Sequence, residues 1–156
     1  MVKVLFVCLG NICRSPMAEA VFRDLVNKQQ FKDQIEVDSA GTAMWHEGKP
    51  PHHGTRNKLD ELNISYDGMV ARQIKSEDFE QFDYIITMDD DNMKTIQSEF
   101  TYSDQVIVKK LMDFVDKPKE ANVPDPYYTG DFDYTYELIK EACDRLLNHI
   151  KIQHNL

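Results

Sequence analysis

Cysteine is scarce in this sequence, and long apolar runs are missing altogether. Only Cys8, Cys13 and Cys143 occur among 156 residues, and an odd, low number excludes a disulfide framework and favours a reducing compartment. No stretch approaches the roughly 18 apolar residues of a transmembrane helix. The apolar run at Val2–Val7 is too short for a signal peptide, and no small-residue cleavage site follows it. We therefore expect a cytoplasmic protein with an ordinary hydrophobic core.

Basic residues are also in short supply relative to acidic ones. The chain has 18 Lys and Arg against 27 Asp and Glu, a formal net charge of -9. A nucleic-acid binder usually carries a basic face, so this balance argues against nucleic acid and, more weakly, against an anionic membrane as partner. A small anionic substrate stays possible because local groups set the field inside a pocket. The length predicts one domain, residues 1–156.

Strand-like and helix-like segments alternate along the chain. Four segments have the length and apolar content of buried strands: Val2–Val7, Gln34–Thr42, Asp83–Met88 and the start of Val106–Val115. Four others carry helical periodicity or helix-start signals: the segment beginning near Pro16, Thr55–Leu62, Asp90–Ser98 and the C-terminal segment from Asp131, with Cys143 on its apolar face. We expect loops at 43–54 and 116–130. The alternation predicts an α/β fold, a parallel sheet with helices on both faces.

The first strand leads into an unusual loop, Cys8–Ser15, with the sequence CLGNICRS. In open α/β sheets, ligands bind beyond the carboxyl ends of the strands. Gly10 and Asn11 tolerate the left-handed backbone region, so the loop can turn several N–H groups inward as an anion nest. The helix that follows points its positive end at the same space, and Arg14 adds a planar fork of donors. The loop is therefore predicted to bind a phosphate group.

A thiol at the bottom of such a nest is a good nucleophile. Helix N-termini and nearby cations stabilise a thiolate, so we expect Cys8 to ionise readily and to accept a hydrogen bond from Ser15. The attacked atom would be phosphorus, with its oxygens held by loop amides and Arg14. A cysteine that ends a buried strand is often only a small core residue, and Cys followed six positions later by Arg is weak evidence. The longer string Cys-x-Gly-Asn-x-Cys-Arg-Ser-Pro is far more specific.

The segment VPDPYYTG offers the second half of a mechanism. Two prolines flank Asp125 and restrict its backbone, although an ordinary turn uses the same residue types. Beside a nucleophilic thiol loop, an aspartate on a stiff loop suits a general acid for the leaving oxygen. Tyr127, Tyr128 and Trp45 are predicted to form flat walls around an aromatic substrate ring.

Two clusters resemble metal sites without the required pattern. His46, His52 and His53 lie in one loop, but their spacing suits no helix pair and no cysteine lies among them. The segment MDDDN from Met88 lacks the glycine and the final acidic residue of a calcium loop. We expect a solvated loop, a capped helix and no metal.

Several motifs together resemble those of the low-molecular-weight protein tyrosine phosphatases, in particular the Gram-positive bacterial members. They are CLGNICRSPMAEA, DSAGT, the Trp45 loop, ARQ, FDYIITMD and DPYY, in the right order over nearly the whole chain. The resemblance implies a four-stranded parallel sheet with the phosphate-binding loop after the first strand. It implies hydrolysis of protein phosphotyrosine and small aryl phosphates through a phosphocysteine, without metal or cofactor. Phosphotyrosine-containing proteins would be substrates, and inorganic phosphate the product and an inhibitor.

Position by position, the resemblance also assigns roles. Cys8 matches the nucleophile, Arg14 the phosphate-binding arginine and Asp125 the general acid and base. The substrate would contact the loop and the aromatic walls through Leu9, Gly10, Asn11, Ile12, Cys13, Ser15, Trp45, Tyr127 and Tyr128. The supporting residues would be Asn11, Ser15, Ser39 and Asp89.

One position departs from the family pattern. Met69 stands where many members have a histidine behind the loop asparagine, so we expect Ser39 alone to support Asn11.

The loop also contains a second cysteine. Cys13 lies five residues after Cys8 and either fills space beneath the loop or captures an oxidised Cys8. The resemblance favours the protective role.

Three other activities share parts of this pattern. Thiol-type arsenate reductases share the fold and loop but use further cysteines after the third strand, where residues 89–104 have none. Related phosphoarginine phosphatases carry threonine at the place of Ile12. A catalytically silent phosphate or phosphotyrosine binder needs neither Cys8 nor Asp125. These comparisons favour a tyrosine phosphatase.

Overall fold

Four parallel strands form the central sheet in the computed structural model, which describes residues 1–156. They are β1 (Val2–Cys8), β2 (Ile35–Gly41), β3 (Tyr84–Thr87) and β4 (Ile107–Lys110), in the order β2-β1-β3-β4. β1 therefore has a neighbour on each side, and its last residue pairs with Gly41 of β2. The predicted four-stranded parallel sheet is confirmed.

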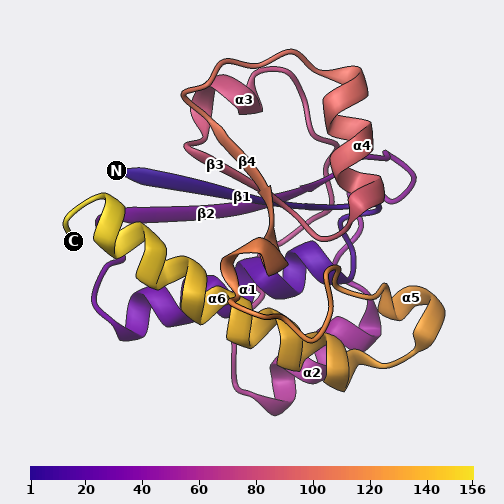
Figure 1. The fold of residues 1–156 in the computed structure, drawn as a ribbon. Coiled ribbons are helices and arrows are strands. Elements are labelled where there is room, and N and C mark those ends of the chain that lie inside the picture. Colours follow the sequence, from indigo (N-terminus) through magenta and orange to yellow (C-terminus); the bar gives the residue numbers. More distant parts are fainter.

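Helices cover both faces of this sheet (Figure 1). On one side lie α1 (Arg14–Lys28), α2 (His53–Glu61), α5 (Pro126–Thr129) and α6 (Phe132–Gln153). On the other side lie α3 (Asp78–Gln81) and α4 (Asp90–Glu99), and the 3-10 turn η1 (Leu111–Phe114) follows β4. The α/β architecture with helices on both faces, expected from the alternation of patterns, is thus confirmed.

The two faces of β1 belong to two hydrophobic cores. Val4 and Phe6 pack in the larger core with α1 and α6, whereas Leu5 and Val7 pack in the smaller core with α3 and α4. All four side chains are completely buried. Burying each contributes roughly 1.5–3 kcal/mol. A strand fixed on both faces and along both edges gives Cys8, at its end, a well-defined position.

Helix boundaries differ from the sequence prediction in two places. α1 begins at Arg14, and Pro16 occupies its third position, where a missing N–H breaks no intrahelical hydrogen bond. α2 begins at His53, two residues earlier than predicted. α3 and α5 are new, because four residues are too few for periodicity to reveal a helix. The predicted cap at the acidic segment is confirmed, since Asp89 Oδ1 accepts from the backbone N–H of Asn92.

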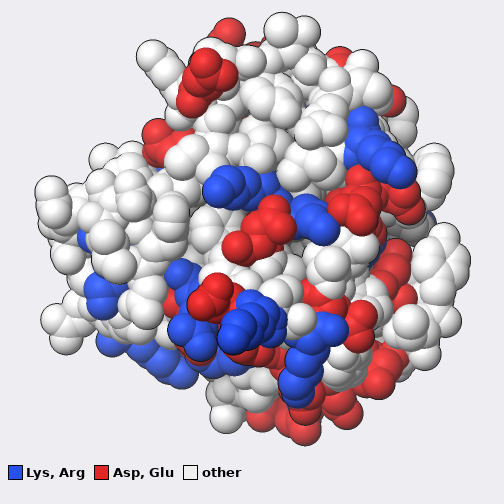
Figure 2. All heavy atoms as spheres, in the orientation of Figure 1, with Lys and Arg blue, Asp and Glu red and all other residues white.

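The surface carries acidic and basic side chains side by side. On the face drawn in Figure 2, blue and red side chains lie interspersed, and no broad basic field appears. None of the helices combines the length and the apolar character needed to cross a bilayer. Cys143, predicted to lie in the core, is completely buried in α6.

Candidate active site

A cavity opens where the loop after β1 meets the first turn of α1. Its volume is about 130 Å³. Eleven residues line it: Cys8, Leu9, Gly10, Ile12, Cys13, Arg14, Trp45, His46, Asp125, Tyr127 and Tyr128. Ten of these were predicted from the sequence to surround the substrate, and they come from three segments separated along the chain. The tertiary structure therefore brings the thiol loop, the Trp45 loop and the VPDPYYTG segment to one place.

The backbone of the loop is arranged as an open ring of donors. Asn11 lies in the left-handed region with φ 57°, which reverses the chain direction locally. None of the backbone N–H groups from Leu9 to Ser15 donates to another atom of the protein. The loop passes close to Gly41 of β2, which has no side chain. A Cβ at this position would lie 2.8 Å from the Leu9 carbonyl oxygen. Such a ring of unpaired amides suits an anion.

The Cys8 sulfur sits above a buried group of hydrogen-bonded side chains. Ser15 Oγ lies 3.0 Å from Cys8 Sγ. Asn11 Nδ2 donates to Ser15 Oγ at 2.8 Å and to Ser39 Oγ at 2.9 Å. The side chains of Asn11, Ser15 and Ser39, predicted as supporting residues, thus form one buried hydrogen-bonded group that connects the loop to β2.

Arg14 closes the base of the cavity and is only 2% exposed. Nη1 donates to Asp89 Oδ2 at 2.6 Å and to the Val123 carbonyl at 2.9 Å, and Nη2 donates to Asp125 Oδ2 at 3.3 Å. Burial favours a lower pKa for this guanidinium, but Cys8, Asp89 and Asp125 together raise it above its usual value. The buried Nε has no partner in the protein, which leaves one donor free for a bound anion.

Asp125 stands at the wall of the cavity with a 21% exposed side chain. Its Oδ1 accepts from the Tyr127 backbone N–H at 3.0 Å, which caps α5, while Oδ2 accepts from Arg14. The cap and the following Pro126 orient the carboxyl group toward the cavity. An acid on a short, capped helix is well placed to exchange a proton with a group bound in the nest.

Three exposed aromatic side chains form the rim. Trp45, Tyr127 and Tyr128 are 68%, 53% and 75% exposed, and the two tyrosine rings meet edge to face with centroids 5.3 Å apart. Large apolar surfaces in water are unusual unless they contact a ligand or partner. All three side chains line the cavity, and their contact with an aromatic substrate ring stays a prediction.

The histidine loop is more organised than the sequence indicated. His46 lines the cavity, with its ring 6.4 Å from that of Tyr127. His52 stacks on Phe132 at 5.3 Å and caps α2 by accepting from the Gly54 backbone N–H. Burial, with the charges of His53 and Arg56, lowers the pKa of His52. The prediction of a simply solvated loop is wrong for these two residues, because the fold packs them against α5 and α6.

Cys13 lines the cavity and is almost fully buried. Burial, together with the negative charges of Cys8 and Asp125, raises its pKa to about 12. The backbone carbonyl of Cys13 accepts from Thr55 Oγ1 at 3.0 Å, which ties the loop to α2. At neutral pH Cys13 is therefore a protonated thiol, chemically distinct from a thiol exposed to the anion nest.

Two residues that support the loop were not identified from the sequence. Arg72 donates its backbone N–H to Asn11 Oδ1 at 3.0 Å, so the expectation that Ser39 alone supports Asn11 is wrong. Glu19 accepts from Ser39 Oγ at 2.6 Å and is also buried. Glu19 and Arg23 are four residues apart on α1, a spacing typical of surface ion pairs, and nothing in it indicated a place under the loop.

Comparisons with known proteins agree over the whole chain. Residues 3–156 match the family model described as low molecular weight phosphotyrosine protein phosphatase. The chain is 49% identical over 156 residues to the low molecular weight protein-tyrosine-phosphatase YfkJ of Bacillus subtilis, covering 100% of both chains. It is 44% identical to PtpA of Staphylococcus epidermidis, covering 100% of this chain and 98% of the relative.

Solved structures show the same similarity in three dimensions. The crystal structure of YfkJ from Bacillus subtilis superposes with a TM-score of 0.95 at 50% identity, covering 98% of this chain and 96% of the other. The Drosophila arginine phosphatase DARP superposes with a TM-score of 0.87 at 35% identity, covering 96% and 98%.

Proposed function

Because this chain belongs to the low molecular weight protein tyrosine phosphatase family, we propose that its cavity hydrolyses phosphotyrosine through a phosphocysteine formed on Cys8. The protein is a protein tyrosine phosphatase, and proteins carrying phosphotyrosine are its substrates. The observation that carries the mechanism is the ring of unpaired N–H groups from Leu9 to Ser15 around the Cys8 sulfur. With the free Nε of Arg14, this ring offers the donors that a phosphoryl group needs.

In the first step, the Cys8 thiolate attacks phosphorus as the bond from phosphorus to the tyrosyl oxygen breaks. Asp125 gives its proton to the departing oxygen, so the phenol leaves neutral. The thiolate and the phosphate dianion repel each other. The loop amides and Arg14 offset this repulsion, since preorganised donors act strongly in a site that excludes water.

In the second step, water attacks the phosphocysteine. Asp125, now a carboxylate, accepts a proton from the water, and the S–P bond breaks to release inorganic phosphate and the Cys8 thiolate. The released phosphate can occupy the same donors, so we expect it to inhibit competitively. We propose that residues 1–156 act as one catalytic domain without a cofactor and in the cytoplasm, where thiols stay reduced.

The proposal is tested by measuring phosphate release from phosphotyrosine, phosphoserine and phosphoarginine peptides side by side, with a chelator present. We expect phosphotyrosine to be the preferred substrate and the chelator to have no effect, because all the proposed steps use side chains of the chain itself. A preference for phosphoserine, or loss of activity with the chelator, contradicts the proposal.

Ile12 is predicted to bias the enzyme toward flat aryl esters. Ile12 and Cys8 line the same cavity, and the Drosophila relative is an arginine phosphatase. We expect Ile12→Thr to shift the phosphoarginine to phosphotyrosine ratio of kcat/KM upward by about tenfold, the scale of a small change in a pocket wall. The measurement is kcat/KM for both substrates in each variant.

Ile12→Val is the matched control, because valine has the shape of threonine without the hydroxyl. It is expected to leave the ratio near that of the wild type. An equal shift in both variants assigns the effect to size alone. An unchanged ratio in Ile12→Thr places selectivity elsewhere, for instance in the Trp45 loop.

Cys13 is predicted to protect Cys8 from peroxide. Peroxide oxidises the Cys8 thiolate to a sulfenic acid and releases hydroxide; the Cys13 sulfur then attacks, water leaves and a disulfide forms. The Cys8 charge, one of the causes that raise the pKa of Cys13, disappears in the neutral sulfenic acid. We expect two thiols lost per chain, no intermolecular link and full recovery with dithiothreitol.

Cys13→Ser is expected to lose most of this recovery, measured against its own activity before peroxide. Cys143→Ala is the control, since that thiol is buried in the core and should recover as the wild type does. Equal recovery in all three proteins, with no Cys8–Cys13 bond in mass spectra, rules out a protective role.

A further inference from the structure

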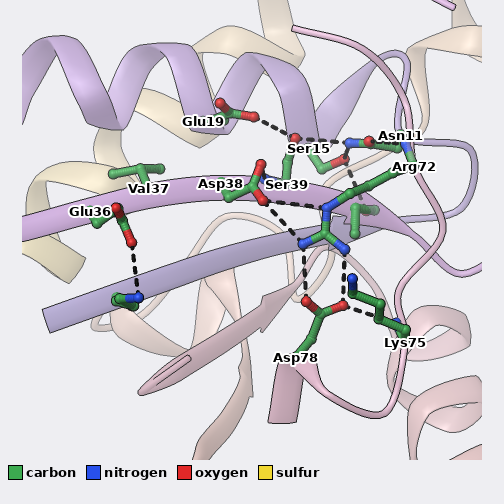
Figure 3. Close-up of polar contacts among 12 residues, drawn as sticks. Asn11, Ser15, Glu19, Glu36, Val37, Asp38, Ser39, Arg72, Lys75 and Asp78 are labelled. Atoms are coloured by element: carbon green, nitrogen blue, oxygen red, sulfur yellow. Dashed lines mark hydrogen bonds and ion pairs between the residues drawn. The ribbon is translucent and has the colours of Figure 1, made fainter. Parts of the chain in front are cut away.

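A chain of hydrogen bonds runs from the buried Glu19 carboxylate to the Cys8 sulfur, beneath the loop that carries the nucleophile. Figure 3 shows its members Glu19, Ser39, Asn11 and Ser15. Its links are Glu19 to Ser39, Ser39 to Asn11, Asn11 to Ser15 and Ser15 to Cys8. All four supporting side chains are buried. Each hydroxyl in this chain has a single proton, so the direction of every bond depends on its neighbours.

Arg72 sets the orientation of the Asn11 amide. Its backbone N–H donates to Asn11 Oδ1, which turns Nδ2 toward the two serines. Figure 3 shows why Arg72 cannot easily move: its guanidinium reaches Asp38 on β2 and Asp78 at the start of α3. Because Asp78 is almost fully buried, this ion pair anchors the backbone that faces Asn11.

The Asn11 amide then determines what each serine can do. Both N–H groups of Nδ2 are used, one on Ser15 Oγ and one on Ser39 Oγ, so both hydroxyls act as acceptors toward Asn11. Each must send its own proton elsewhere. For Ser15 the alternatives are Cys8 Sγ at 3.0 Å and the Ala40 carbonyl at a long 3.4 Å.

For Ser39 the only acceptor is Glu19 Oε1, at 2.6 Å. The Glu19 side chain is 7% exposed, and Oε2 accepts from Arg23, whose guanidinium also donates to the Val37 carbonyl. A carboxylate can only accept hydrogen bonds. Glu19 therefore keeps Ser39 a donor on one side and an acceptor from Asn11 on the other.

We propose that Glu19 is a positioning residue that sets the polarity of this chain, so that the Ser15 hydroxyl donates to the Cys8 thiolate. The inference rests on the proposed function, in which that thiolate is the nucleophile. The Arg72 backbone N–H supports the same polarity, because it donates to Asn11 Oδ1 and so orients the Asn11 amide. Catalysis would thus depend on a carboxylate that touches neither the substrate nor the sulfur.

Glu19→Gln tests the polarity and not merely the packing. Arg23 offers donors, so the Gln amide turns its oxygen to Arg23 and its NH₂ to Ser39. Ser39 then becomes an acceptor from position 19, and its proton points at the Asn11 amide, which already donates there. The conflict is relieved only by weakening the Asn11 contacts, and Ser15 loses the constraint that aims its proton at Cys8.

The readout is the pH dependence of Cys8 alkylation by iodoacetamide, followed by mass spectrometry. We expect the midpoint in Glu19→Gln to lie about one pH unit higher than in the wild type, a tenfold smaller thiolate fraction below the midpoint. The acid limb of the pH profile of kcat/KM should shift to higher pH by the same amount. Glu36→Gln, an exposed carboxylate on β2 paired with Lys3, is the matched control and should not move either profile.

Arg23→Met separates polarity from simple burial of a charge. In the double variant Glu19→Gln/Arg23→Met, the amide is free to turn its oxygen to Ser39, so the alkylation midpoint should return toward the wild-type value. If Glu19→Gln only damaged packing, removing Arg23 as well would not restore the pH profile of Cys8 alkylation. A double variant no better than Glu19→Gln overturns the proposal, as does an unchanged midpoint in the single variant.

A thermal melt shows whether each variant folds. Should Glu19→Gln not fold, Ser39→Ala tests the next link: it frees one Asn11 N–H, and the midpoint should still rise, whereas an unchanged midpoint overturns the proposal. Alkylation does not require turnover, so the two hypotheses separate. Normal phosphotyrosine hydrolysis with no midpoint shift refutes only the role of Glu19, and a shift in a protein that fails to hydrolyse phosphotyrosine refutes only the proposed function.

Discussion

Cys8→Ser is expected to lower turnover of phosphotyrosine by about five to six orders of magnitude, the scale seen when an enzyme loses its nucleophile. A serine hydroxyl at neutral pH is almost entirely protonated and attacks phosphorus poorly, whereas a thiolate is intrinsically nucleophilic. The anion nest consists of backbone N–H groups and Arg14, so the substitution leaves it in place. Inorganic phosphate should therefore still bind, and the melting temperature should change little.

Steady-state kinetics on a phosphotyrosine peptide, with phosphate binding by calorimetry, measure both expectations. Cys143→Ala is the matched control, because it removes a buried thiol in α6 away from the cavity and should keep its turnover. Turnover of Cys8→Ser within about tenfold of the wild type contradicts the covalent mechanism. Loss of phosphate binding together with turnover would mean that Cys8 shapes the nest instead.

Asp125→Ala is expected to slow hydrolysis of phosphotyrosine by about 10²–10⁴, the usual contribution of a general acid. Tyrosine is a poor leaving group, since its phenol has a pKa near 10, and it needs the proton that Asp125 donates. Esters of strongly acidic nitrophenols leave without that proton. The loss should therefore shrink steadily as the leaving phenol becomes more acidic, measured as kcat over a series of aryl phosphates.

Asp125→Asn distinguishes chemistry from structure. Asp125 caps α5 through the Tyr127 backbone N–H, and asparagine preserves that cap and the shape of the side chain. The amide is not an acid of useful strength, so Asn should show the same dependence on the leaving group as Ala. Near-normal rates in Asp125→Asn, or a loss equal across all aryl phosphates, would assign Asp125 a structural role.

The sequence determined the features of this protein that depend on neighbours along the chain. The apolar segment before Cys8, the glycine and asparagine after it and the arginine six residues on predict a strand, an anion nest and a phosphate ligand. Each follows from local backbone preference and side-chain chemistry. Asp125, Tyr127 and Tyr128 share one short segment with flanking prolines, so they could be named from the sequence once the Cys8 loop had indicated the chemistry.

Only the tertiary structure revealed that Glu19 and Arg72 also support the site. Glu19 reads as half of a surface ion pair with Arg23, and it becomes buried because α1 packs against β2 where Ser39 lies. Arg72 supports Asn11 through a backbone N–H, a group that every residue but proline possesses and that no pattern of side chains can indicate. Which polar groups meet in the interior is set by how the elements pack, and a linear pattern does not contain that geometry.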